Sequence, residues 1–286
     1  MKFKIRLPFI SRAAEKRRAA MSASEHAQQK KYAVVQHAAG PKTYSDPKGY
    51  DLLYQFAKFG RGEQRILDLM SGGGLVGKEI GKRLEQDQIP SKTMFVDITR
   101  PQLAKIEQNP NRLRAVGRAF NIPAKANSFG RVFCRYGIKN YQPAEQLEIL
   151  KEIFRVTERG GGLVIQDMVS PSGLKGFMHA ERLAKNLAGG DTKTQNNVPT
   201  KKEWARLLKR AGFRVEEISE KETSHVNTND WVSSKQLTQE QLKSYFAFLE
   251  NVKNTNPAAW KKFSIKRAGG GYEITYPLIL IRAVKP

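Results

Sequence analysis

Apolar runs that are typical of buried strands alternate with single helical segments along most of the chain, and this order constrains the fold more than any other feature. Each run is rich in Val, Ile and Leu with few polar interruptions, as expected of strands covered on both faces. The runs are RILDLM, TMFVDI, LRAVG, RVFCRYG, GLVIQDMV and ITYPLILIRAV. The segments with helical spacing are LVGKEIGKRLEQ, RPQLAKIEQ, PAEQLEILKEIFRVT and TKKEWARLLKRAG. This alternation predicts βαβ units and an α/β fold with a mainly parallel sheet, with ligands beyond the carboxyl ends of its strands.

Two segments interrupt the alternation in this chain of 286 residues. One separates the fifth strand from the next helix, and the other separates the last two strands. Insertions at such places commonly build lids or substrate walls. We expect one main domain over residues 41–286 with insertions at about 170–198 and 221–272, preceded by a basic N-terminal extension over residues 1–40. We also expect the glycines at 160–162 to end the helix before the fifth strand.

The N-terminal extension allows three interpretations: an organellar targeting peptide, an amphipathic helix on a membrane or anionic partner, and a solvated first helix. The third is favoured, because Glu15 and Glu25 are atypical of a targeting peptide and no cleavage signal stands out. We therefore expect a cytoplasmic protein, with an organellar or peripheral membrane location as the alternative.

The formal net charge of +23 is the outlier of the composition. Lys and Arg are scattered, with no tract longer than three residues, which favours a generally basic surface and leaves open contact with nucleic acid or an anionic membrane. No apolar run approaches the roughly 20 residues that span a bilayer. Cys134 is the single cysteine, so the chain has no internal disulfide and no cysteine-based metal cluster, and we predict no metal site.

The stretch ILDLMSGGGLVG holds the strongest local motif. A strand ending in Asp68 leads through Gly72, Gly73 and Gly74 into a helix, and such a turn can present backbone N–H groups to an anionic ligand. Alone, the turn is as compatible with packing as with binding. A second strand, TMFVDIT, ends in Asp97 roughly 30 residues later, where an acid of a βαβ unit can accept hydrogen bonds from a ribose.

With these motifs in this order, the sequence resembles the class I S-adenosylmethionine-dependent methyltransferases, in particular the small-molecule branch that includes the ubiquinone and menaquinone biosynthesis enzymes. The resemblance covers about residues 44–286 and extends to NSFGRVFCRYGIKNY, LKEIFRVTERGGGLVIQDM, WARLLKRAGFRVEEI and the hydrophobic C-terminal strand. It implies a Rossmann-like fold with a mainly parallel seven-stranded sheet and helices on both faces. It also implies S-adenosylmethionine as cofactor and methyl transfer to a small or lipid-like molecule.

The resemblance places the cofactor residue by residue. It puts the amino-acid end of the cofactor over the glycine turn, the ribose on the acid of the second strand, and the adenine against the residues that follow the second and third strands. Arg135, at the end of the fourth strand, is expected among the groups that line the site. The predicted cofactor-binding residues are Asp68, Met70, Ser71, Gly72, Gly74, Asp97, Ile98, Arg118, Ala119 and Arg135.

Three residues depart from the family pattern. Met70 stands where the family usually has its first glycine, and a positive φ there would disfavour methionine. Arg118 stands where an acid commonly accepts the adenine amino hydrogens, and a guanidinium can only donate. Gly130 replaces an aspartate that is more often structural than catalytic. These departures leave open a weakened or altered site.

The sequence does not identify the methyl acceptor. Tyr136, His179 and His225 are the candidates for a catalytic group, although methyl transfer often needs little more than alignment of the nucleophile, and a lone histidine is more often solvated or structural. Two alternatives to a small-molecule methyltransferase remain: an RNA or protein methyltransferase, motivated by the net charge, and a non-catalytic scaffold with a decayed cofactor site.

Overall fold

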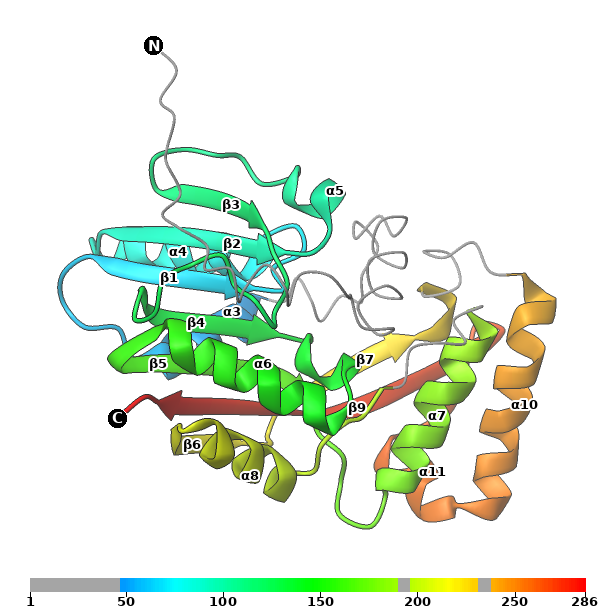
Figure 1. The fold of residues 1–286 in the computed structure, drawn as a ribbon. Coiled ribbons are helices and arrows are strands. Elements are labelled where there is room, and N and C mark those ends of the chain that lie inside the picture. Colours follow the sequence, from blue (N-terminus) through cyan, green and yellow to red (C-terminus); the bar gives the residue numbers. More distant parts are fainter. Residues whose placement is uncertain (1–46, 190–195, 231–237) are drawn as a thin grey trace.

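The fold was analysed in a computed structural model that describes residues 47–189, 196–230 and 238–286. The predicted extension over residues 1–40 lies outside the described residues. Within them, one sheet runs in the order β3-β2-β1-β4-β5-β9-β6, and β7 and β8 pair with β9 (Figure 1). The strands are β1 (Gln64–Leu69), β2 (Ser91–Asp97), β3 (Arg112–Val116), β4 (Phe129–Arg135), β5 (Thr157–Met168), β6 (Arg214–Ser219), β7 (Thr223–Asn227), β8 (Lys266–Ala268) and β9 (Gly271–Val284).

The sheet is parallel from β3 to β5, and β9 is antiparallel to all of its partners. The α/β prediction is therefore confirmed, whereas the strand count is nine within the described residues rather than seven. The two additional strands come from the second insertion. They form because β9 is 14 residues long and extends past the end of β5, which leaves its first half free to pair with β7 and β8.

Helices cover both faces of the sheet. The helices are α3 (Pro47–Ala57), α4 (Leu75–Gln86), α5 (Arg100–Leu103), α6 (Pro143–Val156), α7 (Lys175–Ala188), α8 (Lys201–Ala211), α10 (Gln239–Thr255) and α11 (Pro257–Lys262), with a 3-10 turn, η3, at Ile138–Asn140. Ile149 and Ile153 of α6 and Trp204 of α8 are fully buried against one face. Tyr50 of α3 and Ile80 of α4 are buried against the other. Complete burial of each such aliphatic side chain stabilises the fold by about 1.5–3 kcal/mol.

Two expected boundaries were wrong. The helix expected over RPQLAKIEQ is only the four-residue α5, because Arg114 Nη1 donates to the carbonyl oxygens of Leu103, Ala104 and Ile106, which a longer helix would use. The glycines at 160–162 do not end α6. The helix stops at Val156, β5 starts at once, and the glycines lie inside that strand.

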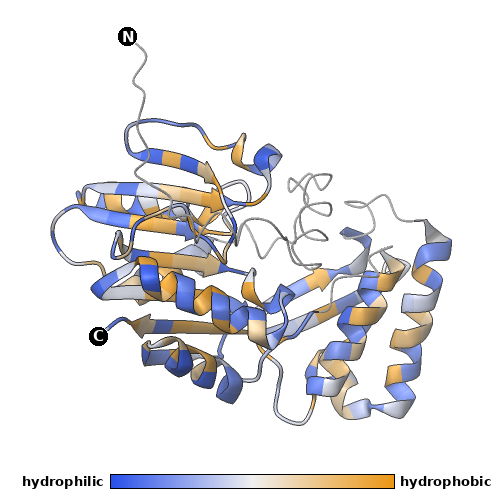
Figure 2. Cartoon of the chain, viewed as in Figure 1, coloured by the Kyte–Doolittle hydropathy of each residue, from blue (hydrophilic) through white to orange (hydrophobic). Residues whose placement is uncertain are grey.

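The insertions form a second layer beside the carboxyl ends of β4 and β5, seen at the right of Figure 1. Helices α7, α10 and α11 pack with the first half of β9 around a separate apolar cluster that includes Phe177, Tyr245, Phe263 and Tyr276. The amphipathic α7 and α10 show both orange and blue residues in Figure 2. No helix in the described ranges is long and apolar enough to cross a bilayer. We call this group of elements the insertion layer.

Candidate functional site

Asp68 fixes the start of the helix that follows the glycine turn. It is the fifth residue of β1, it is 1% exposed, and its Oδ2 accepts the backbone N–H of Gly77 at 2.8 Å. Burial raises the pKa of this carboxyl to about 7, the Gly77 hydrogen bond opposes that rise, and the nearby charge of Asp97 adds to it. Asp68, which the sequence analysis assigned to cofactor binding, therefore accepts a hydrogen bond from the backbone of α4. Its raised pKa means that it titrates near neutral pH.

Asp97 holds the glycine turn from the neighbouring strand. Its Oδ2 accepts the N–H of Gly72 at 2.8 Å, and its Oδ1 accepts the N–H of Thr99, also at 2.8 Å. An ionised carboxylate offers about four acceptor positions, so two remain beyond these backbone bonds. The side chain is half-buried at the carboxyl edge of the sheet. This geometry suits the two hydroxyl donors of a ribose.

Two hydroxyl groups close to Asp97 are available to hydrogen-bond a polar ligand. Ser71 Oγ and Thr99 Oγ1 are buried, and neither has a hydrogen-bond partner in the part of the chain that the structure describes. A buried polar atom left without a partner costs about 1–3 kcal/mol. A Cβ added at Gly72 would meet nothing within 4 Å, so the turn also has open space. The residues present therefore fit the cofactor that the sequence resemblance implies.

Met70 adopts the left-handed backbone conformation that the family pattern fills with glycine. Its φ is 55°, which costs a residue with a Cβ roughly 1–2 kcal/mol. Its side chain lies against the end of β4, since a Cβ built on Gly137 would approach Met70 Sδ to 2.6 Å. Met70 also packs on the main apolar core. The methionine thus links the ends of β1 and β4.

Substituting Gly137 by alanine should disturb this link. The added methyl group needs the space of the Met70 thioether, and overpacking of this kind typically destabilises a protein by about 1–3 kcal/mol. Met70→Ala removes the sulfur and the terminal methyl, so the double variant should lose less free energy of unfolding than the sum of the single variants. Urea unfolding of the four proteins measures this coupling. Gly176→Ala is the control, because nothing lies within 4 Å of the Cβ it would add, and strict additivity would contradict the assigned contact.

Arg135 is held beside the turn by one group from β5, one from α3, and the ring of the next residue, Tyr136. Its Nε donates to Gln166 Oε1 of β5 at 2.6 Å, and its guanidinium lies 4.9 Å from the Tyr50 ring and 5.0 Å from the Tyr136 ring. Its charge also lowers the pKa of Asp68, which places it next to the candidate site. The structure therefore brings Arg135 together with the glycine turn. Tyr136 follows it with φ 56°.

The residues expected around the adenine lie next to Asp97 along the chain and across the sheet. Gly117 N donates to the carbonyl oxygen of Asp97 at 3.0 Å, which brings the segment after β3 to this point. The Arg118 guanidinium lies 5.8 Å from the Phe120 ring. Ala119 is 5% exposed and belongs to the apolar core, so its side chain faces inward. Ile98 is half-buried.

The two histidines lie on the insertion layer and are exposed. His179 is on α7, and His225 is on β7, where its Nδ1 lies 2.9 Å from Thr275 Oγ1. Both are on the insertion layer rather than at the glycine turn, so a catalytic role for them stays a prediction. Gly130 lies at the opposite edge of the sheet, where a Cβ would come within 2.6 Å of Glu158 Oε1. The Glu158 carboxylate is the end of a flexible side chain and can move, so this contact does not by itself explain the glycine.

Sequence analysis missed Thr99 and Gln166. Thr99 precedes Arg100 and Pro101, and a threonine two residues before a proline is a recognisable helix-start signal. Nothing in the sequence singles out Gln166, because its contact with Arg135 depends on the pairing of β4 with β5.

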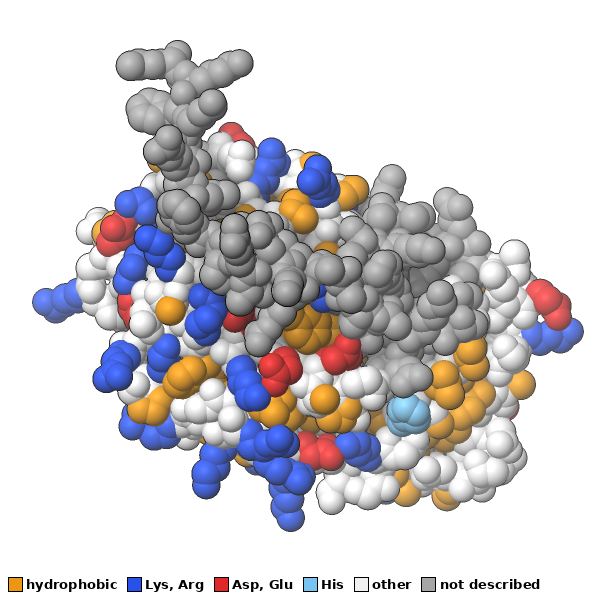
Figure 3. Space-filling view, viewed as in Figure 1, with side chains coloured by type: hydrophobic (Ala, Val, Ile, Leu, Met, Phe, Trp, Pro, Cys, Tyr) orange, Lys and Arg blue, Asp and Glu red, His pale blue; other side chains and the backbone are white. Residues whose placement is uncertain are grey.

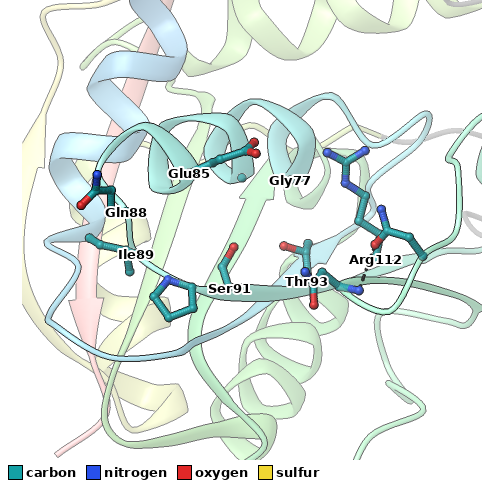
Figure 4. Close-up of a pocket in the computed structure, with 11 residues that line it drawn as sticks. Gly77, Glu85, Gln88, Ile89, Ser91, Thr93 and Arg112 are labelled. Atoms are coloured by element: carbon teal, nitrogen blue, oxygen red, sulfur yellow. Dashed lines mark hydrogen bonds between the residues drawn. The ribbon is translucent and has the colours of Figure 1, made fainter.

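A cavity of about 600 Å³ lies away from this site (Figure 4). It is lined by one side of α4, the turn that follows this helix, and the starts of β2 and β3, including Gly77, Glu85, Ser91 and Arg112. The amino ends of the strands form it, whereas the glycine turn and Asp97 are at the carboxyl ends. Its polar side chains are largely exposed. The cavity is therefore separate from the candidate cofactor site.

Comparison with known proteins identifies the domain. A family model described as a methyltransferase domain matches residues 66–161, which run from β1 into β5 and include the turn, Asp97 and Arg135. No curated protein matches the sequence. Residues 66–161 are therefore similar to a methyltransferase domain, and this match covers less than half of the chain.

Solved structures share the fold over most of the chain. A candidate methyltransferase of Bacillus halodurans is 22% identical with a TM-score of 0.71, over 84% of this chain and 99% of that one. The YcgJ protein of Bacillus subtilis is 16% identical with a TM-score of 0.69, over the same shares. A phosphoethanolamine N-methyltransferase of Haemonchus contortus, solved with S-adenosylhomocysteine, is 18% identical with a TM-score of 0.52, over 84% of this chain and 52% of that one.

Proposed function

We propose that this protein binds S-adenosylmethionine at the glycine turn and transfers its methyl group to a small or lipid-like molecule. The observation that carries the proposal is Asp97, which holds Gly72 and Thr99 by their N–H groups and keeps acceptor positions for a ribose. The unpartnered hydroxyls of Ser71 and Thr99 support it. The phosphoethanolamine N-methyltransferase with the same fold, solved with the demethylated cofactor, adds support.

The protein's own residues would bind the cofactor and the methyl acceptor and orient them toward each other. S-adenosylmethionine supplies, when bound, an electrophilic methyl group on a sulfonium. Asp97 would accept the ribose hydroxyls, and the turn from Met70 to Gly74 would receive the amino-acid end. The insertion layer stands next to the carboxyl ends of β4 and β5, where it would hold the acceptor and exclude water. Alignment of this kind can lower a transfer barrier by several kcal/mol.

Calorimetric titration of the purified protein with S-adenosylmethionine and S-adenosylhomocysteine tests the proposal. We expect both to bind, and S-adenosylhomocysteine to raise the melting temperature. If neither ligand produces heat or stabilisation, the scaffold alternative is favoured instead. In that case, Met70→Gly together with Arg118→Asp should create binding that the parent lacks.

The RNA alternative predicts a different result. Lys and Arg side chains in Figure 3 are spread over the visible face with acidic side chains between them, rather than gathered in one stripe. Several Lys and Arg side chains of the described residues are also paired, as Arg83 is with Asp51 and Lys266 is with Glu273. The part of the face that Figure 3 shows uncovered therefore presents no basic stripe of the kind that binds nucleic acid. Tight RNA binding that falls steeply with salt would reverse this ranking.

A further inference from the structure

A carboxylate is buried in the insertion layer with one of its oxygens unpartnered. Glu181 of α7 is 0% exposed. Its Oε1 accepts the hydroxyls of Tyr245, from α10, at 2.7 Å and of Tyr276, from β9, at 2.6 Å. Its Oε2 is buried and has no hydrogen-bond partner among the described residues. Glu181 therefore joins three elements with one oxygen and keeps the other for something else.

Packing alone does not explain why a carboxylate is buried at position 181. Glu181 lies among the apolar side chains of the insertion layer, and a buried carboxylate costs several kcal/mol unless hydrogen bonds or charges compensate it. Burial, and then the charge of Glu181, raise the pKa of Tyr245 and Tyr276 well above the usual value, so both phenols stay protonated donors. Two donors satisfy Oε1, whereas Oε2 still needs one.

Charged side chains lie between Glu181 and the proposed cofactor site. The charge of Arg182, the next residue, acts on both Tyr276 and Lys139. Lys139 is 5% exposed, and its Nζ donates to the carbonyl oxygen of Tyr136 at 2.7 Å and lies 3.2 Å from Asp167 Oδ1. Tyr136 directly precedes Gly137, on which Met70 packs. Lys139 and Tyr136 therefore lie between the Met70 end of the glycine turn and the charge of Arg182.

A second polar side chain in this region also lacks partners. Asn196 is 3% exposed, and neither its Oδ1 nor its Nδ2 has a hydrogen-bond partner in the described ranges. The next residue, Asn197, donates its N–H to the carbonyl oxygen of Lys139 at 3.0 Å, so Asn196 borders the same cluster. Together, Glu181 and Asn196 leave two acceptors and one donor group unused in a buried region.

We propose that Glu181 and Asn196 form the methyl-acceptor site, and that the acceptor is a polar small molecule that presents a hydroxyl or amino donor to Glu181 Oε2. This inference rests on the proposed function and narrows its substrate class. A wholly apolar acceptor would leave Oε2 unpaired, whereas a donor from the ligand completes the carboxylate. Asn196 supplies one further donor and one acceptor.

Three probes test the inference on the full chain saturated with S-adenosylhomocysteine, and again without it. Ethanolamine carries amino and hydroxyl donors, glycerol carries hydroxyls only, and tetramethylammonium carries charge but no donor. We expect calorimetry to detect ethanolamine, glycerol or both, and not tetramethylammonium. Binding of glycerol indicates hydroxyl recognition, and binding of ethanolamine alone indicates amine recognition.

Glu181→Gln keeps the size of the side chain and an acceptor for the tyrosines, but puts an amide N–H₂ in place of one oxygen. We expect the affinity for the bound probe to fall roughly tenfold or more, with the affinity for S-adenosylhomocysteine unchanged. Asn196→Ala should act in the same direction and covers the case in which Glu181→Gln does not fold. Glu250→Gln is the matched control, because Glu250 also accepts a tyrosine hydroxyl, from Tyr272, but is at the surface.

The outcomes separate the two proposals. If S-adenosylhomocysteine does not bind, the proposed function fails. If it binds but no donor probe does, or if Glu181→Gln and Asn196→Ala bind the probe as the parent does, the acceptor site is overturned while the cofactor site stands. If a buried water molecule is the partner of Glu181 Oε2, S-adenosylhomocysteine should bind and none of the donor probes should.

Discussion

Asp97→Asn should reduce the affinity for S-adenosylhomocysteine about 100-fold or more. The carboxylate accepts N–H groups with both oxygens, whereas an amide can turn its single oxygen to Gly72 or to Thr99 but not to both. The substitution also removes the charge-assisted bonds expected from the ribose, each of which contributes about 1.5–3 kcal/mol. Calorimetry at one pH and salt concentration measures the change in Kd.

Glu148→Gln is the control for Asp97→Asn. Glu148 is exposed on α6 and pairs with Lys151 at 2.8 Å, so its substitution makes the same change in net charge far from the turn. Its Kd should match that of the parent. If the Kd of Asp97→Asn is within about threefold of the parent's, the binding free energy has changed by less than 1 kcal/mol. That result would show that Asp97 does not bind the cofactor.

Asp68→Asn should change how stability depends on pH. Folding raises the pKa of Asp68 from its usual 3.8 to about 7, so the folded state binds the proton more tightly than the unfolded state between these values. The free energy of unfolding of the parent should therefore fall as the pH rises from about 4 to about 7. Asp68 accounts for a loss of up to roughly 4 kcal/mol, and above about pH 7 it causes no further loss. The asparagine variant lacks this loss and still offers Gly77 an acceptor oxygen.

Urea unfolding at pH 5 and pH 8 measures this effect. The variant should gain free energy of unfolding relative to the parent as the pH is raised, and at pH 8 it should be the more stable of the two. The same comparison with Glu148→Gln corrects for the loss of one carboxylate. If the difference between Asp68→Asn and the parent is the same at both pH values, Asp68 does not titrate in this range.

Local sequence pattern was sufficient for the parts of the fold and site that depend on one βα unit. Asp68 and Asp97 were found because each ends an apolar strand, and parallel strands bring their carboxyl ends to one edge. The extent of α5 was not predictable in this way, because Arg114 from the next strand takes the carbonyl oxygens at its end. A hydrogen bond from a neighbouring strand to the end of a helix leaves no mark on the spacing of apolar residues in that helix.

The same reasoning explains what the sequence did not reveal about the site. Met70 was recognised as a departure, but its packing on Gly137 requires β1 and β4 to be neighbours, although they are separated by two other strands in the chain. Glu181, Tyr245 and Tyr276 come from three distant segments. Each is unremarkable in its own stretch, and only the folded chain brings the acid and its two phenols together.

Strand β9 belongs both to the central sheet and to the insertion layer. Its second half, from Leu278 to Val284, pairs with β5 in the central sheet, and its first half pairs with β7 and β8 in the insertion layer. A continuous strand has no hinge loop between the halves, so the layer cannot swing away from the cofactor edge as a separate body. Opening of the proposed acceptor site would have to come from the helices of the layer, because one strand connects the layer to the edge that holds the proposed cofactor site.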